Sequence, residues 1–586
     1  MRKLFLLIII LSLVLTFPAF AGTIKKVDIL FHQKVPARDG INLNVDIYKP
    51  ADLKESLPTL FVFTPYTTDG VYKDAMFFAE NGYVVVAGDM RGRGNSEGEF
   101  IPFEFEGKDG YDICKWISGQ PWSNGEIGMF GGSYVGMVQW LILKEMPPAL
   151  KTIIPTATVG PGIDFPMLNN ILYTYNTQWL TFTLGNALNR NAFIDHKYWN
   201  AVYAELFINH IPYAKLDEIS GMGIDKNFQN WISHPKFDEY YRNVLPKPEE
   251  YAKFNIPILT ITGHFDDDQP GTMNYYNSFM KYGTGTARNN CYFIIGPWNH
   301  GGTRRPKKEH QNMKFGENSV LDMNKLHLEW FNWTLKDSSK PEFLKDKVAS
   351  YEMGSNEWKY ASQLNGLHNE EHIYYIHSQG GKVNDVFNSG YLNFQKPKKE
   401  KPDSYTYNPI DTIGASEKIQ EQLIDFAWRE EKEAFAPDKL VYHSEPFAAD
   451  VVFTGQVGLN AYISMDVPDT DFEAILYEIR PDGKCIYLTS DLMRARHRNS
   501  LEQEEFVEKD EIYLYNFKTF HFISRKLMKG SRLRLVVGAL NSPYYQKNYN
   551  SGGDVSFETA KDAKTAKVKL WHNSDYPSSL ILPIVK

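Results

Sequence analysis

The chain has 586 residues, of which 43% are hydrophobic and 14% aromatic, a globular composition on a chain too long for a single core. We therefore expect two or three domains. The formal net charge of −8 argues against a nucleic-acid-binding protein. Cys114, Cys291 and Cys485 are far apart and show neither a CxxC pair nor a histidine cluster, so no zinc site is expected.

The first residues have the pattern of a secretory signal peptide. Arg2 and Lys3 precede an apolar run over residues 4–17, and residues 19–21 (Ala-Phe-Ala) match a small-residue cleavage site. We expect a signal peptide over residues 1–21, export to the periplasm or the cell exterior, and no stable membrane span after cleavage. A signal anchor is the alternative, although the apolar run is short for a bilayer span.

Buried strands alternate with helical segments in residues 22–159. Residues 41–48 alternate as a half-buried strand does, and residues 60–63 and 83–87 are continuous apolar runs typical of central parallel strands. Residues 72–81 between these two runs have a helical pattern. This order predicts a parallel α/β sheet.

Residues 125–143 have the layout of a nucleophile elbow. An apolar strand reaches Gly131, Gly132 and Ser133, and a buried helix follows at once. Glycines beside the serine allow a tight turn where a Cβ would collide with neighbouring backbone. The usual G-x-S-x-G pattern is altered, because the glycine after the serine is Gly136, three residues on. A surface turn is the alternative interpretation.

The alternation stops over residues 160–251, which are rich in Asn, Tyr, Trp and Phe at helical spacing and predict an inserted helical cap. The sheet resumes in residues 252–344, with apolar runs at 256–262 and 291–295 and a closing helix at about 321–335. Residues 345–586 contain short alternating strands with hairpin signals, which predict a β-sandwich.

A nucleophilic serine needs a base and a carboxylate, which in this kind of sheet follow in the order Ser, Asp, His at the ends of later strands. Asp266 and His300 follow the runs 256–262 and 291–295. His264 competes as the base but would reverse the order, and Asp267 and Asp268 compete with Asp266. We expect Ser133, Asp266 and His300 to form the triad.

An oxyanion hole must supply hydrogen-bond donors to the carbonyl oxygen as it gains charge. The backbone N–H of Tyr134, the residue after the nucleophile, is one candidate. The second donor is expected from the loop after residues 60–63, where the hydroxyl of Tyr66 could replace a backbone amide. A packing role is the alternative for Tyr66.

Several segments together resemble the superfamily of Xaa-Pro dipeptidyl-peptidases, cocaine esterases and α-amino acid ester hydrolases, a family of CocE/NonD-type serine hydrolases. The segments are residues 38–40 (RDG), 65–66 (PY), 89–98 (DMRGRGNSEG), 131–136 (GGSYVG), 263–266 (GHFD) and 296–300 (GPWNH). Residues 481–483 (PDG), 492–496 (LMRAR) and 530–535 (GSRLRL) resemble its C-terminal jelly-roll domain. The resemblance covers nearly the whole mature chain.

The resemblance implies an α/β-hydrolase core, a helical cap and a jelly-roll domain. It also implies the triad above and the pair Tyr66 and Tyr134 as the oxyanion hole, and the displaced glycine is the form found in this family. One departure is His264-Phe265, where the family tends to have a tryptophan and another aromatic residue.

The triad specifies acyl transfer to water through an acyl-enzyme and leaves the acyl group open. In relatives that hydrolyse α-amino acid esters, carboxylates hold the substrate ammonium. Asp268, Asp164 and Trp298 are the candidate substrate-binding residues, although Gln269 stands where a further acid would fall. A competing interpretation takes Arg304 and Arg305, just past His300, as a site for an acidic acyl group.

The expected substrate is a small ester, an amide or a short peptide, and a preference for α-amino acyl groups is one option. The alternatives are a Xaa-Pro dipeptidyl-peptidase and, in another class, a non-catalytic glycan- or surface-binding protein that uses the jelly roll. The proposed chemistry requires no metal and no organic cofactor. A homo-oligomer is compatible with the sequence, which does not decide the oligomeric state.

Overall fold

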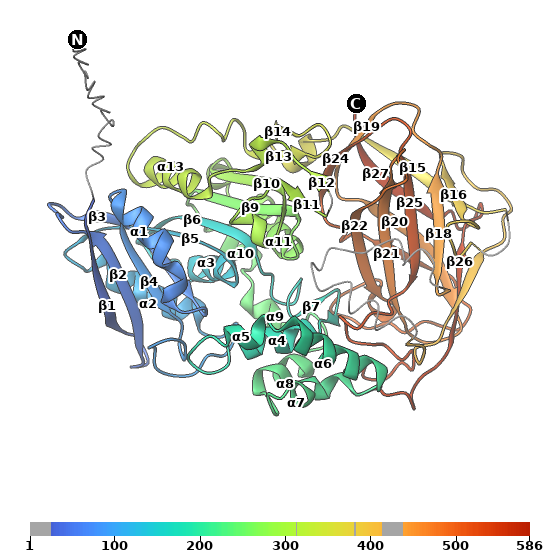
Figure 1. Ribbon diagram of the computed structural model, residues 1–586, viewed down its shortest axis with the longest axis horizontal. Coiled ribbons are helices and arrows are strands. Elements are labelled where there is room, and N and C mark those ends of the chain that lie inside the picture. The colour runs from blue at the N-terminus through green and yellow to red at the C-terminus, as the bar shows by residue number, and fades with distance from the viewer. Residues whose placement is uncertain (1–24, 312, 380–382, 413–436) are drawn as a thin grey trace, which may run out of the picture.

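The structure is a computed structural model that describes residues 25–311, 313–379, 383–412 and 437–586. The predicted signal peptide, residues 1–21, lies outside the described residues. Figure 1 shows an α/β core in blue to yellow-green, a helical insertion below it, and a β domain in orange and red beside both. This arrangement confirms the predicted fold class of an α/β core with inserted helices, followed by an all-β domain.

Ten strands of the described residues form the first sheet. In spatial order they are β1 (Val27–Pro36), β2 (Asn42–Pro50), β4 (Val84–Asp89), β3 (Leu57–Thr64), β5 (Ser123–Ser133), β6 (Leu150–Thr158), β9 (Ile258–Phe265), β10 (Cys291–Asn299), β13 (Val348–Glu352) and β14 (Glu357–Ala361). The strands from β4 to β13 in this order run parallel. Their carboxyl ends therefore meet along one edge of the sheet, where the site lies.

Helices cover both faces of this sheet. They are α1 (Tyr72–Glu80) and α13 (Met323–Leu335) on one face, and α2 (Glu106–Ser118), α3 (Tyr134–Lys144) and α11 (Gln269–Tyr282), followed by the short α12 (Gly285–Arg288), on the other. Successive side chains of β3 pack on opposite faces of the sheet: Leu60 and Val62 face the α1 side, while Phe61 and Phe63 face the α3 side. Burial on both faces explains why these strands read as continuous apolar runs.

The predicted helical insertion is present between β6 and β9. It consists of a short hairpin, β7 (Met167–Leu168) and β8 (Ile171–Leu172), and the helices α4 (Tyr175–Phe182), α5 (Arg190–Phe193), α6 (His196–Ile208), α7 (Leu216–Ile219), α8 (Lys226–Ser233), α9 (Glu239–Val244) and α10 (Pro248–Tyr251). No helix within the described residues has the length and hydropathy that crossing a bilayer requires.

The second sheet is largely antiparallel and holds thirteen strands of the described residues. They are β15 (Glu370–His377), β16 (Gly390–Asn393), β17 (Asp403–Tyr407), β18 (Lys439–Ser444), β19 (Val451–Gly455), β20 (Gly458–Met465), β21 (Asp471–Ile479), β22 (Cys485–Arg494), β23 (Tyr513–Phe517), β24 (Ile523–Leu527), β25 (Arg532–Ala539), β26 (Ala566–Trp571) and β27 (Ser579–Val585). A separate small hairpin, β11 (Glu309–His310) and β12 (Met313–Lys314), follows β10. We call residues 370–586 the β domain.

The boundary between the two sheets differs from the one expected at residue 345. β13 and β14 lie after that residue and still extend the first sheet, because Phe293–Ile295 of β10 pair with Val348–Ser350. The second sheet begins at Glu370, in β15. Short alternating strands have the same sequence pattern in either sheet, so only their pairing shows where they belong.

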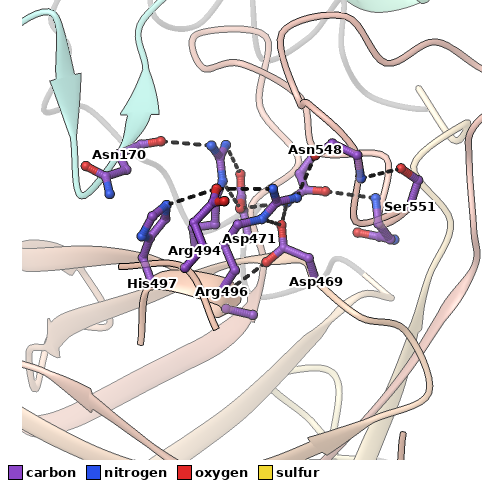
Figure 2. A network of polar contacts seen from close by, with 12 residues as sticks. Asn170, Asp469, Asp471, Arg494, Arg496, His497, Asn548 and Ser551 are labelled. Atoms are coloured by element: carbon purple, nitrogen blue, oxygen red, sulfur yellow. Dashed lines mark hydrogen bonds and ion pairs between the residues drawn. The ribbon is translucent and has the colours of Figure 1, made fainter. Parts of the chain in front are cut away.

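A buried polar network joins the β domain to the hairpin of the insertion (Figure 2). Arg494, at the end of β22, forms an ion pair with Asp471 of β21 through Nε and Nη2, at 2.8 and 2.9 Å. Its Nη1 donates to the carbonyl oxygen of Asn170, between β7 and β8, at 2.8 Å. A second pair, Arg496 with Asp469 at 2.8 Å, lies beside the first. The network holds the end of β22 against the insertion, and that strand end forms part of the site.

Candidate active site

The predicted nucleophile, Ser133, lies where β5 ends and α3 begins, with no loop between strand and helix. Its φ of 65° is a left-handed backbone conformation that few side chains adopt and that is typical of a nucleophile elbow. A Cβ on Gly131 would lie 2.3 Å from Val135 Cγ1. A Cβ on Gly136 would lie 2.8 Å from the carbonyl oxygen of Thr156 in β6. The displaced glycine is therefore explained by the close packing of α3 on β6.

The predicted acid and base follow two neighbouring parallel strands, β9 and β10. Asp266 Oδ1 lies 2.9 Å from His300 Nδ1, and Asp266 Oδ2 accepts a hydrogen bond from Thr262 Oγ1 at 2.7 Å. Burial alone would raise the pKa of Asp266, but the hydrogen bond and charge of His300 bring it below its ordinary value. Asp266 is thus suited to remain ionised and to orient the imidazole, leaving Nε2 of His300 as the basic atom.

The two competing carboxylates lie differently. Asp267 is exposed. Asp268 accepts a long hydrogen bond from Ser133 Oγ at 3.5 Å, and the same oxygen, Oδ2, lies 3.5 Å from His300 Nδ1. Burial raises the pKa of Asp268 well above its ordinary value, and the nearby charges of Asp164 and Asp266 raise it further against the opposing effect of His300. Asp268 is therefore a carboxyl beside the nucleophile that a cationic ligand would stabilise in its ionised form.

Tyr66 follows β3 and brings its hydroxyl to the nucleophile. The hydroxyl accepts a hydrogen bond from Trp179 Nε1 of α4 at 3.0 Å, so its own proton remains free for another acceptor. Burial raises the pKa of Tyr66 to about 12, while its contacts with Trp179 and Ser133 oppose that shift. The phenol is thus protonated at neutral pH and can act as a donor.

Tyr134 contributes through its backbone. As the first residue of α3 its N–H has no partner within the helix and lies next to Ser133. Its side chain is engaged elsewhere, because the hydroxyl donates to Oε1 of Glu106, and the N–H of Phe103 donates to the same two groups at 3.0 Å each. Burial raises the pKa of Glu106 to about 7. These contacts anchor the ring behind the elbow and leave the backbone amide for the site.

Ser133, His300, Tyr66 and Asp268 line one cavity of about 450 Å³. Its walls come from three parts of the chain, and the residues from the insertion and the β domain are largely aromatic. Those residues are Phe165, Leu168, Tyr173, Tyr175, Gln178, Trp179, Phe193, His196, Trp199, Asn200 and Tyr203 from the insertion, and Tyr487, Ser490, Asp491, Leu492, His521, Tyr544 and Tyr545 from the β domain. A volume of this size suits a small-molecule acyl group.

Two other predicted substrate-binding residues are placed differently from Asp268. Asp164 lines the cavity, but its oxygens accept the backbone N–H groups of Gly160 at 2.7 Å and of Gly271 at 2.5 Å, so it braces the start of the insertion against α11. Trp298 is buried on the α1 side of the sheet and its Nε1 donates to the carbonyl oxygen of Ser319 at 2.9 Å. The structure does not bring Trp298 to the cavity.

The competing residues from the sequence are also located. His264 is buried, its Nε2 donates to the carbonyl oxygen of Tyr351 at 2.8 Å, and burial lowers its pKa to about 4. It is thus engaged with the backbone instead of with Ser133. Neither arginine at 304 and 305 lines the cavity, and Arg305 is exposed. Arg304 nevertheless lies beside the site, because burial lowers its pKa and the charges of Asp266 and Asp268 oppose that shift.

Sequence reasoning missed three residues of the site. Trp179 lies in a helix of the insertion, and no local pattern shows that its indole reaches Tyr66. Asp491 comes from the β domain, where it lines the cavity and binds Thr519 and Asn169, and burial raises its pKa to about 6. Thr262 could have been found from one sequence signal, because it lies four residues before Asp266 at the end of a predicted strand. Within the described residues no group of three or more His, Cys, Asp or Glu side chains is placed to hold a metal ion.

Comparison with known proteins identifies the family. Residues 39–302 match the family described as X-Pro dipeptidyl-peptidase (S15 family), and residues 345–581 match the X-Pro dipeptidyl-peptidase C-terminal non-catalytic domain. The chain belongs to the S15/CocE family of serine hydrolases. As a member of this family it acts on esters or peptides.

One curated member of the S15/CocE family, the cocaine esterase of Rhodococcus sp. (strain MB1 Bresler), is 26% identical over 593 residues, which cover 94% of this chain and 98% of the esterase. Among solved structures, an α-amino acid ester hydrolase has a TM-score of 0.80 at 18% identity, covering 97% of this chain and 100% of that one. An aminopeptidase from a marine sediment Thaumarchaeota archaeon has a TM-score of 0.78 at 20% identity, covering 95% and 96%. At these identities the two structures support the fold.

Proposed function

We propose that this chain is an exported serine esterase that hydrolyses small acyl esters through an acyl-enzyme and prefers acyl groups with a free α-amine. The pairing of Asp266 with His300 at 2.9 Å, in the same cavity as the elbow residue Ser133, carries the proposal. These three side chains come from the carboxyl ends of β5, β9 and β10, three parallel strands of one sheet, where hydrolases of this fold hold their triad.

In the proposed mechanism Ser133 Oγ attacks the substrate carbonyl carbon while Nε2 of His300 takes its proton. The tetrahedral oxyanion accepts hydrogen bonds from the Tyr66 hydroxyl and from the backbone N–H of Tyr134. His300 then returns the proton to the leaving alcohol, and the acyl-enzyme forms. A water molecule, deprotonated by His300, attacks the acyl carbon and the acid is released with Ser133 restored. Asp266 holds the imidazole in the required tautomer throughout.

The preference for an α-amine rests on the charge of the cavity. Asp164, Asp267, Asp268 and Asp491 line it, and none of the described lining residues is lysine or arginine, although the guanidinium of Arg304 lies near enough to Asp268 to interact with its charge. Asp268 stands closest to the nucleophile, 3.5 Å from Ser133 Oγ, where the amine of an attached α-amino acyl group would lie. The aromatic walls supply ring faces that also attract cations. We therefore assign the ammonium-binding role to Asp268.

The test compares hydrolysis of phenylglycine methyl ester, its Nα-acetyl derivative and a simple acetyl ester by the wild type, Ser133→Ala and Asp268→Asn. We expect Ser133→Ala to lose all ester turnover. In Asp268→Asn we expect kcat/KM for the free-amine ester, divided by kcat/KM for the acetylated ester, to fall roughly tenfold to 100-fold. The reason is that hydrogen bonds to charged groups contribute about 1.5–3 kcal/mol.

Asp52→Asn is the matched control, because it removes the same charge from an exposed side chain outside the cavity lining. An equal loss of preference in both variants would show a general effect of charge and would overturn the role of Asp268. Equal turnover of the free-amine and acetylated esters by the wild type would overturn the amine preference itself.

The alternative activity, release of Xaa-Pro from peptides, is supported by the family match over residues 39–302. A Gly-Pro anilide added to the same panel separates the two activities. Anilide turnover that is lost in Ser133→Ala, with esters cleaved slowly, would assign the chain as a dipeptidyl-peptidase. If the wild type does not hydrolyse the anilide, the result supports the esterase proposal.

The export part of the proposal rests on the pattern of residues 1–21 alone. Amino-terminal sequencing of the protein recovered outside the cytoplasm should begin at Gly22. Recovery of the protein only from the cytoplasm, with Met1 retained, would contradict export.

A further inference from the structure

Gln269 is a buried residue that no part of the proposed chemistry uses. It is the first residue of α11 and directly follows residues 263–268, which we call the acid loop because they contain Asp266. Its side chain is only 1% exposed. A buried side-chain amide has two donors and an acceptor that need partners, so its hydrogen bonds show what it holds together.

The Gln269 amide spans from the acid loop to the β domain. Its Nε2 donates to the carbonyl oxygens of Gly263 at 2.8 Å and of Phe522 at 3.1 Å. Its Oε1 accepts from the backbone N–H of Phe522 at 2.5 Å. The side chain thus pairs with both peptide groups of Phe522, as a neighbouring strand would, while the bond to Gly263 closes the acid loop on itself.

The other end of the acid loop is attached to the same place. The ring of His264 stacks on that of Phe522, with centroids 6.1 Å apart and planes 8° apart, and donates to the carbonyl oxygen of Tyr351 in β13. Phe522 immediately precedes β24, and its neighbour His521 lines the cavity. Both ends of the loop therefore rest on one residue of the β domain.

Within the loop, Asp266 depends on this attachment for its position. Its backbone N–H donates to the carbonyl oxygen of Gly263 at 3.3 Å, and the backbone N–H of Gln269 donates to the carbonyl oxygen of Asp266 at 3.0 Å. The carboxylate then meets His300 at 2.9 Å. A shift of the loop would change that distance first, and a misplacement of about 1 Å can cost roughly 100-fold in rate.

We propose that Gln269 is a positioning residue that fastens the acid loop to the backbone of Phe522, so that the β domain holds Asp266 in place against His300. The inference rests on the triad proposed above. It gives the β domain a part in catalysis that reaches beyond lining the cavity, although the matching family domain carries the description non-catalytic.

The chemistry of the contact supplies a specific test. Glutamate has the shape of glutamine, but an ionised carboxylate can only accept, so in Gln269→Glu the two carbonyl oxygens of Gly263 and Phe522 would face negative charge. A protonated carboxyl regains one donor. Turnover of Gln269→Glu relative to the wild type should therefore rise as the pH falls from about 8 to about 5, because the neutral form restores part of the contact.

The measurement is kcat and KM for the simple acetyl ester, which has no amine, so that charge at position 269 does not act on a charge of the substrate. We expect Gln269→Leu, which makes none of the three bonds, to lower kcat by roughly tenfold to 100-fold with KM changed less than about threefold. If Gln269→Leu does not fold, the proposal is tested by Gln269→Glu alone, through the pH dependence of its turnover relative to the wild type.

Gln120→Leu and Gln120→Glu are the matched controls, because this half-buried amide just after α2 donates to the carbonyl oxygen of Trp116 at 3.2 Å and lies outside the cavity lining. Their kcat and pH profiles should equal those of the wild type. The proposal would be overturned if the turnover of Gln269→Glu relative to the wild type did not change with pH, or if Gln269→Leu had the kcat of the wild type. Activity in Ser133→Ala would instead overturn the triad, so the two failures are distinguishable.

Discussion

At the scale of single residues, the site combines groups whose protonation states are set by their surroundings. Burial keeps the Tyr66 phenol protonated, with its pKa raised to about 12, and His300 keeps Asp266 ionised. The indole of Trp179 supports the arrangement, because its N–H bonds to the Tyr66 oxygen and directs the hydroxyl proton away from itself. In the proposed mechanism the Tyr66 hydroxyl is thus oriented as the oxyanion donor before the substrate binds.

Tyr66→Phe tests this residue directly. Removing the hydroxyl should lower kcat for the acetyl ester roughly 100-fold to 1,000-fold, as loss of one oxyanion donor costs about 3–4 kcal/mol of transition-state stabilisation. KM should change little, because the donor acts mainly on the charge that develops in the transition state. Steady-state kinetics at neutral pH measure both values.

Tyr83→Phe is the control for this experiment. It removes a buried phenol hydroxyl that bonds to Asn332 of α13 at 2.9 Å, on the face of the sheet covered by α1 and α13. It should reduce thermal stability and leave kcat unchanged. Similar kcat losses in both variants would mean that Tyr66 acts through packing.

At the scale of elements, the turn from β5 to α3 carries the proposed nucleophile, and the packing of α3 on β6 sets the position of that turn relative to the sheet. Gln139 of α3 also joins this junction, since its amide donates to the carbonyl oxygen of Ile154 at 3.1 Å and accepts from the N–H of the same residue at 3.0 Å. The helix therefore approaches β6 closely at two points, and one of them is Gly136.

Gly136→Ala should be harmful although alanine favours helices by about 1 kcal/mol. The new Cβ would lie 2.8 Å from the carbonyl oxygen of Thr156 and 3.0 Å from Thr158 Oγ1, so α3 must move away from β6. Overpacking of this kind costs about 1–3 kcal/mol, and the shift would carry the backbone N–H of Tyr134 with it. We expect a lower melting temperature and a lower kcat.

Gly285→Ala is the comparison, because a Cβ at this position in α12 meets nothing within 4 Å. It should leave both melting temperature and kcat at or above wild-type values. If Gly136→Ala behaved in the same way, the close approach of α3 to β6 would not be what holds the elbow.

At the scale of the whole molecule, the cavity forms only where three parts of the chain meet. The core supplies the proposed triad, the insertion supplies Trp179 and most of the aromatic wall, and the β domain supplies a third wall that includes Asp491 and His521. Arg494 is fixed by its ion pair with Asp471 inside the β domain, and its hydrogen bond to the carbonyl oxygen of Asn170 holds that third wall against the insertion (Figure 2). Breaking such a buried pair would leave an uncompensated charge in the interface.

Truncation tests the need for the β domain. A chain that ends near residue 345 lacks β13, β14 and the β domain, and we expect it to be insoluble or inactive. A chain that ends at residue 366 keeps all ten strands of the first sheet and still loses Phe522 and Asp491. It should also lack esterase activity, because the acid loop and the cavity wall lose their supports.

Size-exclusion chromatography and acetyl ester hydrolysis check both truncations. The exposed apolar surface left by the missing domain predicts aggregation. A soluble and fully active protein from either truncation would contradict the role given to the β domain.

The sequence by itself determined the order of the parts and predicted the chemistry of the site. Continuous apolar runs, the Gly-Gly-Ser turn and the polar residues after two later runs are local signals, so Ser133, Asp266 and His300 could be named from spacing and chain order. The same holds for the helical insertion and for the all-β character of the later residues. These features depend on neighbours in the chain and are visible without a fold.

The tertiary structure alone decided which distant residues meet. Trp179 reaches Tyr66 across 113 residues, and Gln269 reaches Phe522 across 253. It also placed β13 and β14 in the first sheet, moved Trp298 away from the cavity and engaged both oxygens of Asp164 with backbone. Burial and hydrogen-bond partners arise from packing between segments far apart in the chain, so no local pattern could reveal them.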